Sequence, residues 1–368
     1  MKSWSKLIIL SVAAVLIVGT ILVLETKKNS QSFLAVDQPV KTSQPAAGKD
    51  RRYETAKEIV SPAGFINDEP FKIQDLIGKK VILVDFWTYS CINCQRTLPY
   101  LTSWYDKYQD QGLEIIGIHT PEFEFEKKLA NVERAVEQYG IKYPVVLDND
   151  YGTWRNYANR YWPHKYLIDI DGFIVYDHIG EGGYAETEQE IQKLLAERQQ
   201  VLGEGGSIAS DMVNPTGVEQ VDTSRLYSPE IYFGSARNTN LGNGQSGQTG
   251  SQNFILPNNI RRDNLYLAGS WNIQPEFAEN QQAGAKIVFY YQAQKVFIVA
   301  RSDQPVKLQI LRDGQPVGEV SGRDVINGEV TVQADQLYRL IEDSEWGEHT
   351  LEIIVESPGL QVFTFTFG

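Results

Sequence analysis

Two cysteines, Cys91 and Cys94, are the only thiols in the 368-residue chain, and their spacing is C-x-x-C. Zinc sites, short structural disulfides and redox-active dithiols all use this spacing. A structural zinc site needs four nitrogen or sulfur ligands, whereas this chain offers two thiols and four histidines without ligand spacing. A structural disulfide across so short a loop would stabilise the fold little. The pattern therefore favours a redox centre, for which we expect no metal and no cofactor.

The surroundings of the two thiols strengthen this interpretation. A predicted buried strand, 79–87, leads directly into a predicted helix from Cys91 to about Gln109. Free backbone N–H groups and the positive end of the helix dipole stabilise a thiolate at a helix N-terminus, so we expect a lowered pKa for Cys91. Cys94 lies one turn later on the same helix face, where it can resolve a mixed disulfide formed at Cys91.

Strands and helices alternate around this motif, which indicates an α/β sheet. We expect a short hairpin and a helical turn within 62–76, further strands at 113–120, 143–150, 165–172 and 173–180, and helices at 123–140 and 186–200. The Asp171-Gly172 step predicts that the last two strands form a hairpin.

The chain changes character after Leu202. A Gly/Ser/Pro-containing linker, 203–220, is followed by a region, 221–368, with almost no helical period. Strand-like alternation is found at 286–301, 305–320, 337–341, 349–357 and 359–368, with a hairpin signal at Asp313-Gly314 and a polar loop at 234–252. These short strands predict a β-sandwich of jelly-roll-like type, which we expect to fold separately from the α/β domain, 53–202.

The N-terminal segment predicts a membrane anchor. Leu7 to Leu24 carries no charge and, as a helix, would extend about 27 Å. It is longer than a signal-peptide core and lacks a small-residue cleavage site, so we expect an uncleaved signal-anchor within 1–28 and a flexible stalk over 29–52. The body is expected outside the cytoplasm. The net charge of −13 argues against nucleic acid as a partner.

The stretch VDFWTYSCINC, 84–94, resembles the active-site sequence of the thioredoxin superfamily. The resemblance implies that Asp85 lies buried beneath Cys94 with a raised pKa and takes or relays its proton. It also implies that Pro99 kinks the active-site helix. In RYWPHKYLIDIDG, 160–172, it makes Pro163 the cis-proline that faces the dithiol.

The same resemblance places four further side chains around a substrate groove: Trp87, Tyr89, Trp162 and His164. Each of them can instead serve packing alone. Asp85 likewise has an alternative role, as a strand-end acid bonded to backbone.

Longer segments narrow the family. WTYSCINC, HTPEFEFEK, YPVVLDNDYGTW, YWPHKYLIDIDG and GEGGYAETE together resemble the extracytoplasmic thioredoxin domain of DipZ proteins, a branch of the TlpA/ResA-like group. YSPEIYFGSARNTN, LAGSWNIQPEFAEN and FTFTFG resemble the carbohydrate-binding-module-like sandwich that follows it. DipZ proteins usually begin with a multi-span CcdA-like region, so electrons would here come from a separate CcdA-like membrane partner. The dipeptide Ile92-Asn93 differs from that of some relatives, so their redox potential does not transfer.

The resemblance implies a membrane-anchored, extracytoplasmic thiol–disulfide oxidoreductase that reduces disulfides of exported proteins, with cytochrome c apoproteins among the candidate clients. Two alternatives stay open: an oxidase of exported thiols, and a surface protein whose sandwich binds cell-wall glycan or another protein. The aromatic side chains that would stack on sugar, or else fill the sandwich core, are Tyr266, Trp271, Phe277, Tyr290, Tyr291 and Trp346.

Overall fold

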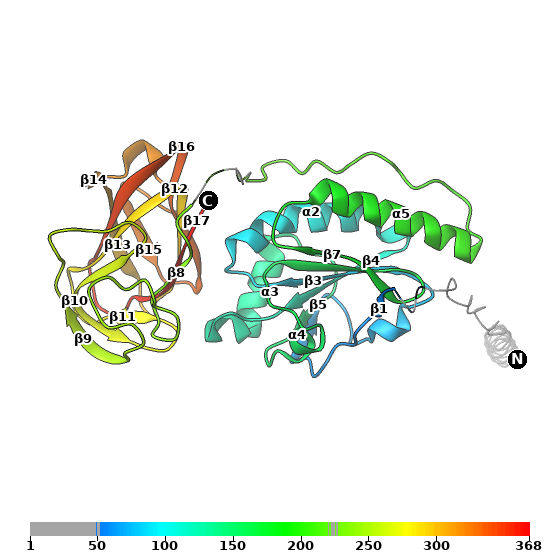
Figure 1. Ribbon diagram of the computed structural model, residues 1–368, viewed down its shortest axis with the longest axis horizontal. Helices are drawn as coiled ribbons and strands as arrows, with labels where there is room; N and C mark the ends of the chain where they lie inside the picture. Colours follow the sequence, from blue (N-terminus) through cyan, green and yellow to red (C-terminus); the bar gives the residue numbers. More distant parts are fainter. Residues whose placement is uncertain (1–48, 50–51, 220, 222–224, 226) are drawn as a thin grey trace, which may run out of the picture. The chain divides into compact units, whose positions relative to one another are not determined.

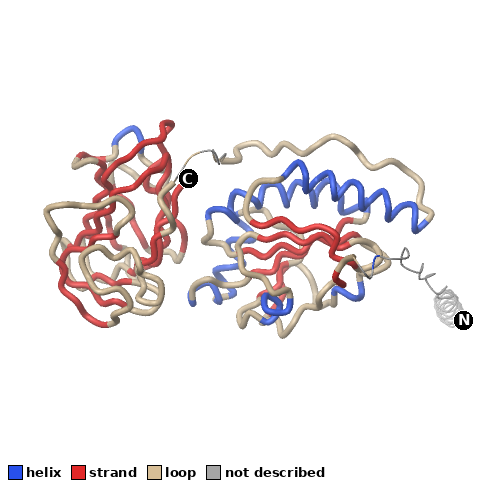
Figure 2. Tube along the Cα trace, viewed as in Figure 1, coloured by secondary structure: helices blue, strands red, loops and turns tan. Residues whose placement is uncertain are grey.

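The computed structural model describes residues 49, 52–219, 221, 225 and 227–368, which lie within one compact unit, Pro45–Gly368. An α/β lobe, 52–202, is followed by a β lobe, 227–368 (Figures 1 and 2). The predicted α/β fold followed by a β-rich domain is thus confirmed. The predicted anchor helix, 7–24, lies outside the described residues, and the helices that are described are all too short or too polar to cross a membrane.

A seven-stranded sheet forms the centre of the α/β lobe, in the order β1-β7-β6-β3-β4-β5-β2. Its strands are β1 (Glu54–Thr55), β2 (Gly64–Ile66), β3 (Val81–Trp87), β4 (Leu113–His119), β5 (Val145–Leu147), β6 (His164–Ile168) and β7 (Phe173–Ile179). The helices are α2 (Ile92–Tyr108), α3 (Leu129–Gln138), α4 (Gly152–Asn156) and α5 (Tyr184–Leu202), with 3-10 turns η2 (Ile73–Asp75), η3 (Gln109–Gln111) and η4 (Glu124–Lys127). Helices α2 and α5 lie over one face of the sheet and α4 over the other (Figure 1).

Two local expectations for this lobe need correction. The hairpin expected within 62–76 is wrong, because β2 pairs with the distant β5. The helix expected over 123–140 is divided into η4 and α3, with Lys128 in extended conformation between them. The hairpin at Gly172 is confirmed, since β6 and β7 pair antiparallel across it.

Strand β3 shows how the sequence directs side chains to the two faces. Val81, Leu83 and Trp87 point into the cluster beneath α2 and α5, whereas Ile82 and Val84 belong to the opposite cluster. Because side chains alternate along a strand, the carboxylate of Asp85 must point to the α2 face. The local pattern therefore places an ionisable group in the hydrophobic core under the cysteines.

The β lobe is one ten-stranded sheet system, with main order β14-β13-β16-β12-β10-β11-β17-β8. Its strands are β8 (Ile231–Tyr232), β9 (Gly250–Phe254), β10 (Leu265–Ile273), β11 (Ala278–Asn280), β12 (Ala285–Arg301), β13 (Val306–Arg312), β14 (Gln315–Pro316), β15 (Glu329–Val332), β16 (Gln336–Val355) and β17 (Gln361–Phe367), with a 3-10 turn η5 (Gly318–Val320). The segments expected as two strands, 337–341 and 349–357, belong mainly to one long strand, β16, which ends at Val355.

The long strand β12 pairs with different strands along its length, and so belongs to two parts of the sheet. Its first half pairs with β10, its second half pairs with β17, and the register with β16 shifts between Ala293 and Lys295. One hydrophobic cluster collects residues from both halves. A sheet folded over its own core in this way buries the apolar face of its alternating strands.

The two lobes share a hydrophobic cluster. Four buried β-lobe residues, Phe297, Val299, Leu337 and Phe363, belong to the same cluster as the core beneath α2. The ring centroid of Phe363 lies 5.0 Å from that of Phe123 and 4.7 Å from that of Phe125. Separate folding of the lobes remains a prediction, but separation would expose this apolar surface to water.

The junction also carries an ionic contact. The carboxylate of Glu219, in the linker, lies 2.8 Å from Arg96 of α2, 2.9 Å from Arg339 of β16 and 3.1 Å from Lys295 of β12. Arg96 and Arg339 have little exposed surface, so screening by solvent is reduced at this contact. One linker carboxylate thus binds cations from both lobes.

We expect Phe363→Ala to lower the free energy of unfolding of the full chain by about 3 kcal/mol, because it empties a buried ring site at the shared cluster. Denaturant unfolding, followed by tryptophan fluorescence and circular dichroism, measures the change. Ile255→Ala is the matched control: this side chain is 80% exposed, and its removal should cost less than about 0.5 kcal/mol. Similar small losses for both variants would show that the lobes do not stabilise one another.

Candidate redox site

The two thiols differ sharply in access. Cys91 is the N-cap of α2 and half-buried, whereas Cys94 lies in the first turn with 1% of its surface exposed. Burial, then hydrogen bonding and charge at Cys91, raises the pKa of Cys94 well above its ordinary value. An accessible sulfur is therefore paired with a buried one that holds its proton.

Asp85 lies in the core under this pair. Its side chain is 1% exposed, and neither carboxylate oxygen has a hydrogen-bond partner among the described residues. Burial raises the pKa of Asp85 to about 7, and the charge of Lys165 opposes that rise. The negative charge of Asp85 in turn contributes to the raised pKa of Cys94. A carboxyl group that titrates near neutral pH is thus coupled to the buried thiol by its charge, without a direct hydrogen bond between them.

Lys165 is a member of the site that the sequence analysis missed. It pairs directly with Asp85 across strands β3 and β6, is completely buried, and donates a hydrogen bond from Nζ to the carbonyl of Gly180 at 3.0 Å. Burial lowers the pKa of Lys165, while Asp85 and Cys94 raise it. The sequence does offer a signal for Lys165. It lies two residues before Leu167 on the same strand, so its side chain points to the same face, toward the core beneath α2.

The structure confirms the cis peptide bond between Trp162 and Pro163. The Pro163 carbonyl accepts a hydrogen bond from the backbone N–H of Gly180 at 2.8 Å. Trp162 is half-buried, and its ring N–H donates to the carbonyl of Thr120 at 3.0 Å. This loop and Cys91 line the same cleft.

The other residues predicted to rim the groove lie deeper. Trp87 has no exposed surface and contacts His119 edge-on at 5.1 Å. Tyr89 is 5% exposed and stacks on His119. His164 is buried between Asn159 and Asp177, at 2.6 and 3.0 Å. Of the four predicted rim residues, Trp162 is the one that shares a cleft with Cys91.

The cleft at Cys91 has a volume of about 410 Å³ and is lined by both lobes. The α/β lobe contributes Cys91, Ile92, Asn93, Glu122, Arg160, Tyr161 and Trp162. The β lobe contributes Ser228, Glu230, Tyr232, Arg237, Thr366 and Phe367. No local sequence pattern associates these β-lobe residues with the dithiol, because the segments lie far apart in the chain.

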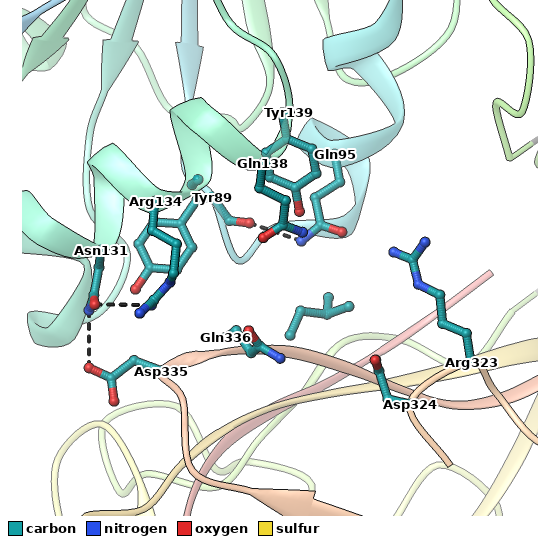
Figure 3. Close-up of a pocket in the computed structure, with 12 residues that line it drawn as sticks. Tyr89, Gln95, Asn131, Arg134, Gln138, Tyr139, Arg323, Asp324, Asp335 and Gln336 are labelled. Carbon is teal, nitrogen blue, oxygen red and sulfur yellow. Dashed lines mark hydrogen bonds between the residues drawn. The ribbon is translucent and has the colours of Figure 1, made fainter. Parts of the chain in front are cut away.

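A second, smaller cleft of about 160 Å³ lies beside Tyr89 (Figure 3). Asn131 of α3 donates a hydrogen bond to Asp335 of the β lobe at 3.0 Å, and Gln95 donates to the Tyr89 carbonyl at 2.9 Å. Neither cysteine lines this cleft. Its polar contacts connect the lobes next to the redox site.

Glu126 holds the residues next to Cys91 in place, and the sequence did not predict this role. Its buried carboxylate accepts a hydrogen bond from Ser90 Oγ at 2.6 Å and from the backbone N–H groups of Glu122 and Phe123 at 2.5 and 3.0 Å. Burial raises its pKa to about 7. One carboxylate thus ties the residue before Cys91 to the loop that carries Glu122.

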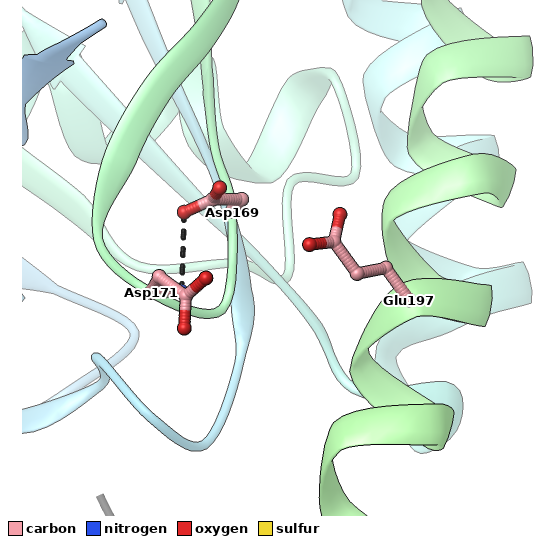
Figure 4. A group of neighbouring side chains, drawn as sticks. All are labelled: Asp169, Asp171 and Glu197. Atoms are coloured by element: carbon pink, nitrogen blue, oxygen red, sulfur yellow. Dashed lines mark hydrogen bonds between the residues drawn. The ribbon is translucent and has the colours of Figure 1, made fainter. Parts of the chain in front are cut away.

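Three carboxylates elsewhere, Asp169, Asp171 and Glu197, lie close enough together to hold a metal ion (Figure 4). The Nζ atom of Lys49 lies 2.7, 2.9 and 2.6 Å from them. Burial disfavours the charge on Lys49, but the three hydrogen bonds outweigh it and raise its pKa. The lysine thus supplies the positive charge between these carboxylates.

Two family models and several known proteins match this chain. Residues 55–177 match the AhpC/TSA family, and residues 228–368 match the family described as thioredoxin like C-terminal domain. Protein DipZ of Mycobacterium bovis is 36% identical over 317 residues, which cover 85% of this chain and 43% of that protein. The chain therefore spans less than half the length of this relative.

Shorter proteins match about a third of the chain. Thiol-disulfide oxidoreductase ResA of Bacillus thuringiensis is 33% identical over 129 residues, covering 35% of this chain and 71% of that protein. A solution structure of a thioredoxin-like protein in the oxidized form is 27% identical, with a TM-score of 0.37, and the match covers 39% of this chain and 97% of that chain.

We expect Asp85→Asn to slow the resolution of a mixed disulfide at Cys91 by on the order of 10²-fold at pH 8, because Cys94 loses its proton acceptor. In the unmodified protein the resolution rate should rise with pH and level off above the Asp85 pKa of about 7. In the variant the rate should instead keep rising toward the much higher pKa of Cys94. Rapid mixing with a fluorescent disulfide across the pH range separates formation from resolution. Equal slowing of both steps would contradict the proton-acceptor role.

Lys165→Met should move the inflection of the pH dependence of the resolution rate to higher pH, because the cation that lowers the Asp85 pKa is gone. Lys286→Met, on the partly exposed surface of the β lobe, is the matched control and should leave the inflection in place. An inflection that stays near 7, or falls, in Lys165→Met would show that Lys165 does not tune Asp85.

Proposed function

Since the chain belongs to the ResA-like family of thiol–disulfide oxidoreductases, we propose that it reduces disulfide bonds of exported proteins. The observation that carries this proposal is the pairing of accessible Cys91 with buried Cys94 above Asp85. A binding protein with an inactive thioredoxin fold would not need a titratable carboxyl group buried under the second thiol, where it costs stability.

The geometry supports a two-step exchange. The Cys91 thiolate attacks one sulfur of the substrate disulfide, a bond forms between Cys91 and the substrate, and the departing substrate sulfur takes up a proton. Cys94 then loses its proton to Asp85 and attacks the Cys91 sulfur. The Cys91–Cys94 disulfide forms as the bond between Cys91 and the substrate breaks, the departing substrate sulfur takes up a proton, and two electrons have passed to the substrate. Regeneration requires a dithiol donor, for which we propose a CcdA-like membrane partner.

The direction of exchange depends on the reduction potential of the Cys91–Cys94 pair. A value near thioredoxin's, about −270 mV, supports reduction of clients, and a value near about −120 mV supports oxidation of exported thiols. Equilibration of the full chain with glutathione or dithiothreitol buffers measures it. A potential near about −120 mV would contradict the reductase proposal and favour the oxidase alternative.

We expect Cys94→Ser to accumulate mixed disulfides through Cys91, because the attacking sulfur stays accessible and the resolving one is lost. Cys91→Ser should accumulate few, since Cys94 is buried. Non-reducing electrophoresis of each variant after reaction with a disulfide-bonded protein reports the difference. The reverse pattern would exchange the roles of the two thiols, and absence of trapping in both would contradict the proposed activity.

The proposed location is the extracytoplasmic side of the bacterial cytoplasmic membrane, with a single N-terminal anchor. The uncharged run Leu7–Leu24 supports it. A reporter that needs export, fused after Gly368, should therefore be active, and a reporter that works only in the cytoplasm should be silent. Cytoplasmic activity would remove both the location and the exported clients.

Binding of cell-wall glycan is a weaker candidate function. Trp271 and Tyr291 have no exposed surface, and Tyr266 is 3% exposed, so these rings fill the β-lobe core. Phe277 packs on Phe363 at 5.3 Å. Stacking on a sugar ring needs an exposed aromatic face, which Trp271, Tyr291 and Tyr266 do not offer.

A further inference from the structure

The wall that faces the redox motif across the cleft is supplied by the β lobe. Tyr232 lies on β8, at the edge of the β-lobe sheet, and Thr366 and Phe367 lie at the end of β17. These side chains line the same cleft as Cys91 and Trp162. A disulfide that reaches Cys91 through this cleft must therefore pass β-lobe side chains as well as the cis-proline loop.

Polar contacts fix this wall against the α/β lobe. The Glu122 carboxylate accepts a hydrogen bond from Tyr232 Oη at 2.9 Å and binds Arg237 at 2.7 Å. The Arg237 guanidinium lies 3.7 Å from the centre of the Tyr232 ring. Phe363, on the same strand as Thr366, is buried in the cluster shared by the lobes. The cleft is thus bounded by held side chains on both sides.

The two carboxylates of the cleft, Glu122 and Glu230, differ in the partners that they contact. Tyr232 has one hydroxyl proton but lies 2.9 Å from Glu122 and 2.7 Å from Glu230. Arg237 neutralises Glu122 directly. Glu230 is exposed at the cleft, but desolvation of its carboxylate by the surrounding protein, followed by the charge of Glu122, raises its pKa to about 7, and Arg237 opposes that rise. Glu230 therefore lies where an additional cation would be stabilised.

Two further features belong to the lining of the cleft. Thr366 lines it, and the Thr366 Oγ1 atom has no hydrogen-bond partner within the described part of the chain. Arg160, the other cation of the lining, projects from the opposite, α/β side. The net charge of −13 attracts cationic partners at long range.

We propose that the β lobe is the specificity-determining wall of the redox cleft, and that Glu230 receives a basic side chain beside the reactive cysteine of an extended substrate segment. The inference rests on the proposed function for the meaning of "substrate". It adds the chemical class of that substrate and a role for the β lobe. Glu230 acts here by binding, while the electron transfer stays with Cys91 and Cys94.

The test uses the full chain with both cysteines replaced by serine, so that binding is measured without exchange. Two disulfide-bonded peptides, identical except for Lys or Glu next to one cysteine, are titrated against tryptophan fluorescence. We expect the Lys peptide to bind about three- to fivefold more tightly than the Glu peptide, as for a partly exposed ion pair. Glu230→Gln should remove this preference, and Glu230→Lys should reverse it.

Glu356→Gln is the matched control, because this exposed β-lobe glutamate makes the same change of charge away from the cleft. It should keep the preference for the Lys peptide. If Glu230→Gln and Glu356→Gln both keep the preference, or if neither peptide is preferred by the parent protein, the proposed wall is overturned.

Turnover with the cysteines present separates this inference from the proposed function. If the serine-substituted protein prefers the Lys peptide but the unmodified protein reduces neither peptide, the reductase proposal fails and the binding wall stands. If the unmodified protein reduces both peptides equally and Glu230→Gln changes nothing, the reductase stands and the wall fails.

Discussion

Burial of Asp85 beneath Cys94 is the constraint on which the rest of the site depends. Removing a carboxyl group from water is costly, and the group responds by holding its proton near neutral pH. The core tolerates it because Lys165 lies opposite on the next strand and shares the burial. Helix α2, the strand β3 and the loop at Pro163 then need only bring an accessible sulfur above this pair.

The second constraint is the attachment of the β lobe. Phe363 and its neighbours fill part of the core that supports α2, and Glu219 joins cations of both lobes. A domain attached through a flexible linker alone would leave the surface around Cys91 open to many partners. Here the attachment converts that surface into a cleft with two sides, so stability and substrate selection are served by the same contacts.

Local sequence patterns predicted what local physics determines. The apolar run ending at Trp87 predicted strand β3, and the cysteine spacing predicted the start of α2. Gly172 predicted the hairpin of β6 and β7, and the thioredoxin resemblance predicted the cis bond at Pro163. Long-range pairing was less accessible: β2 pairs with β5, and β16 continues through what alternation divided into two strands. Aromatic residues were the weakest guide, because a buried Trp87 and a cleft-lining Trp162 look alike in sequence. The contribution of Glu230 and Tyr232 could not be predicted, since it follows from how the lobes meet.

The same geometry limits how the Cys91–Cys94 disulfide can be reduced again after a reaction. Cys94 is buried and Cys91 lines the cleft between the two lobes, so a donor dithiol that attacks Cys91 through this cleft occupies the space that a client uses. Donor and client therefore exclude one another, and both must present their sulfur on a segment that fits between the cis-proline loop and the β lobe. Selectivity by the β-lobe wall would apply to both half-reactions. A partner that supplies electrons is then expected to share the chemistry of the segments it helps to reduce: an exposed sulfur on an extended chain, with positive charge beside it.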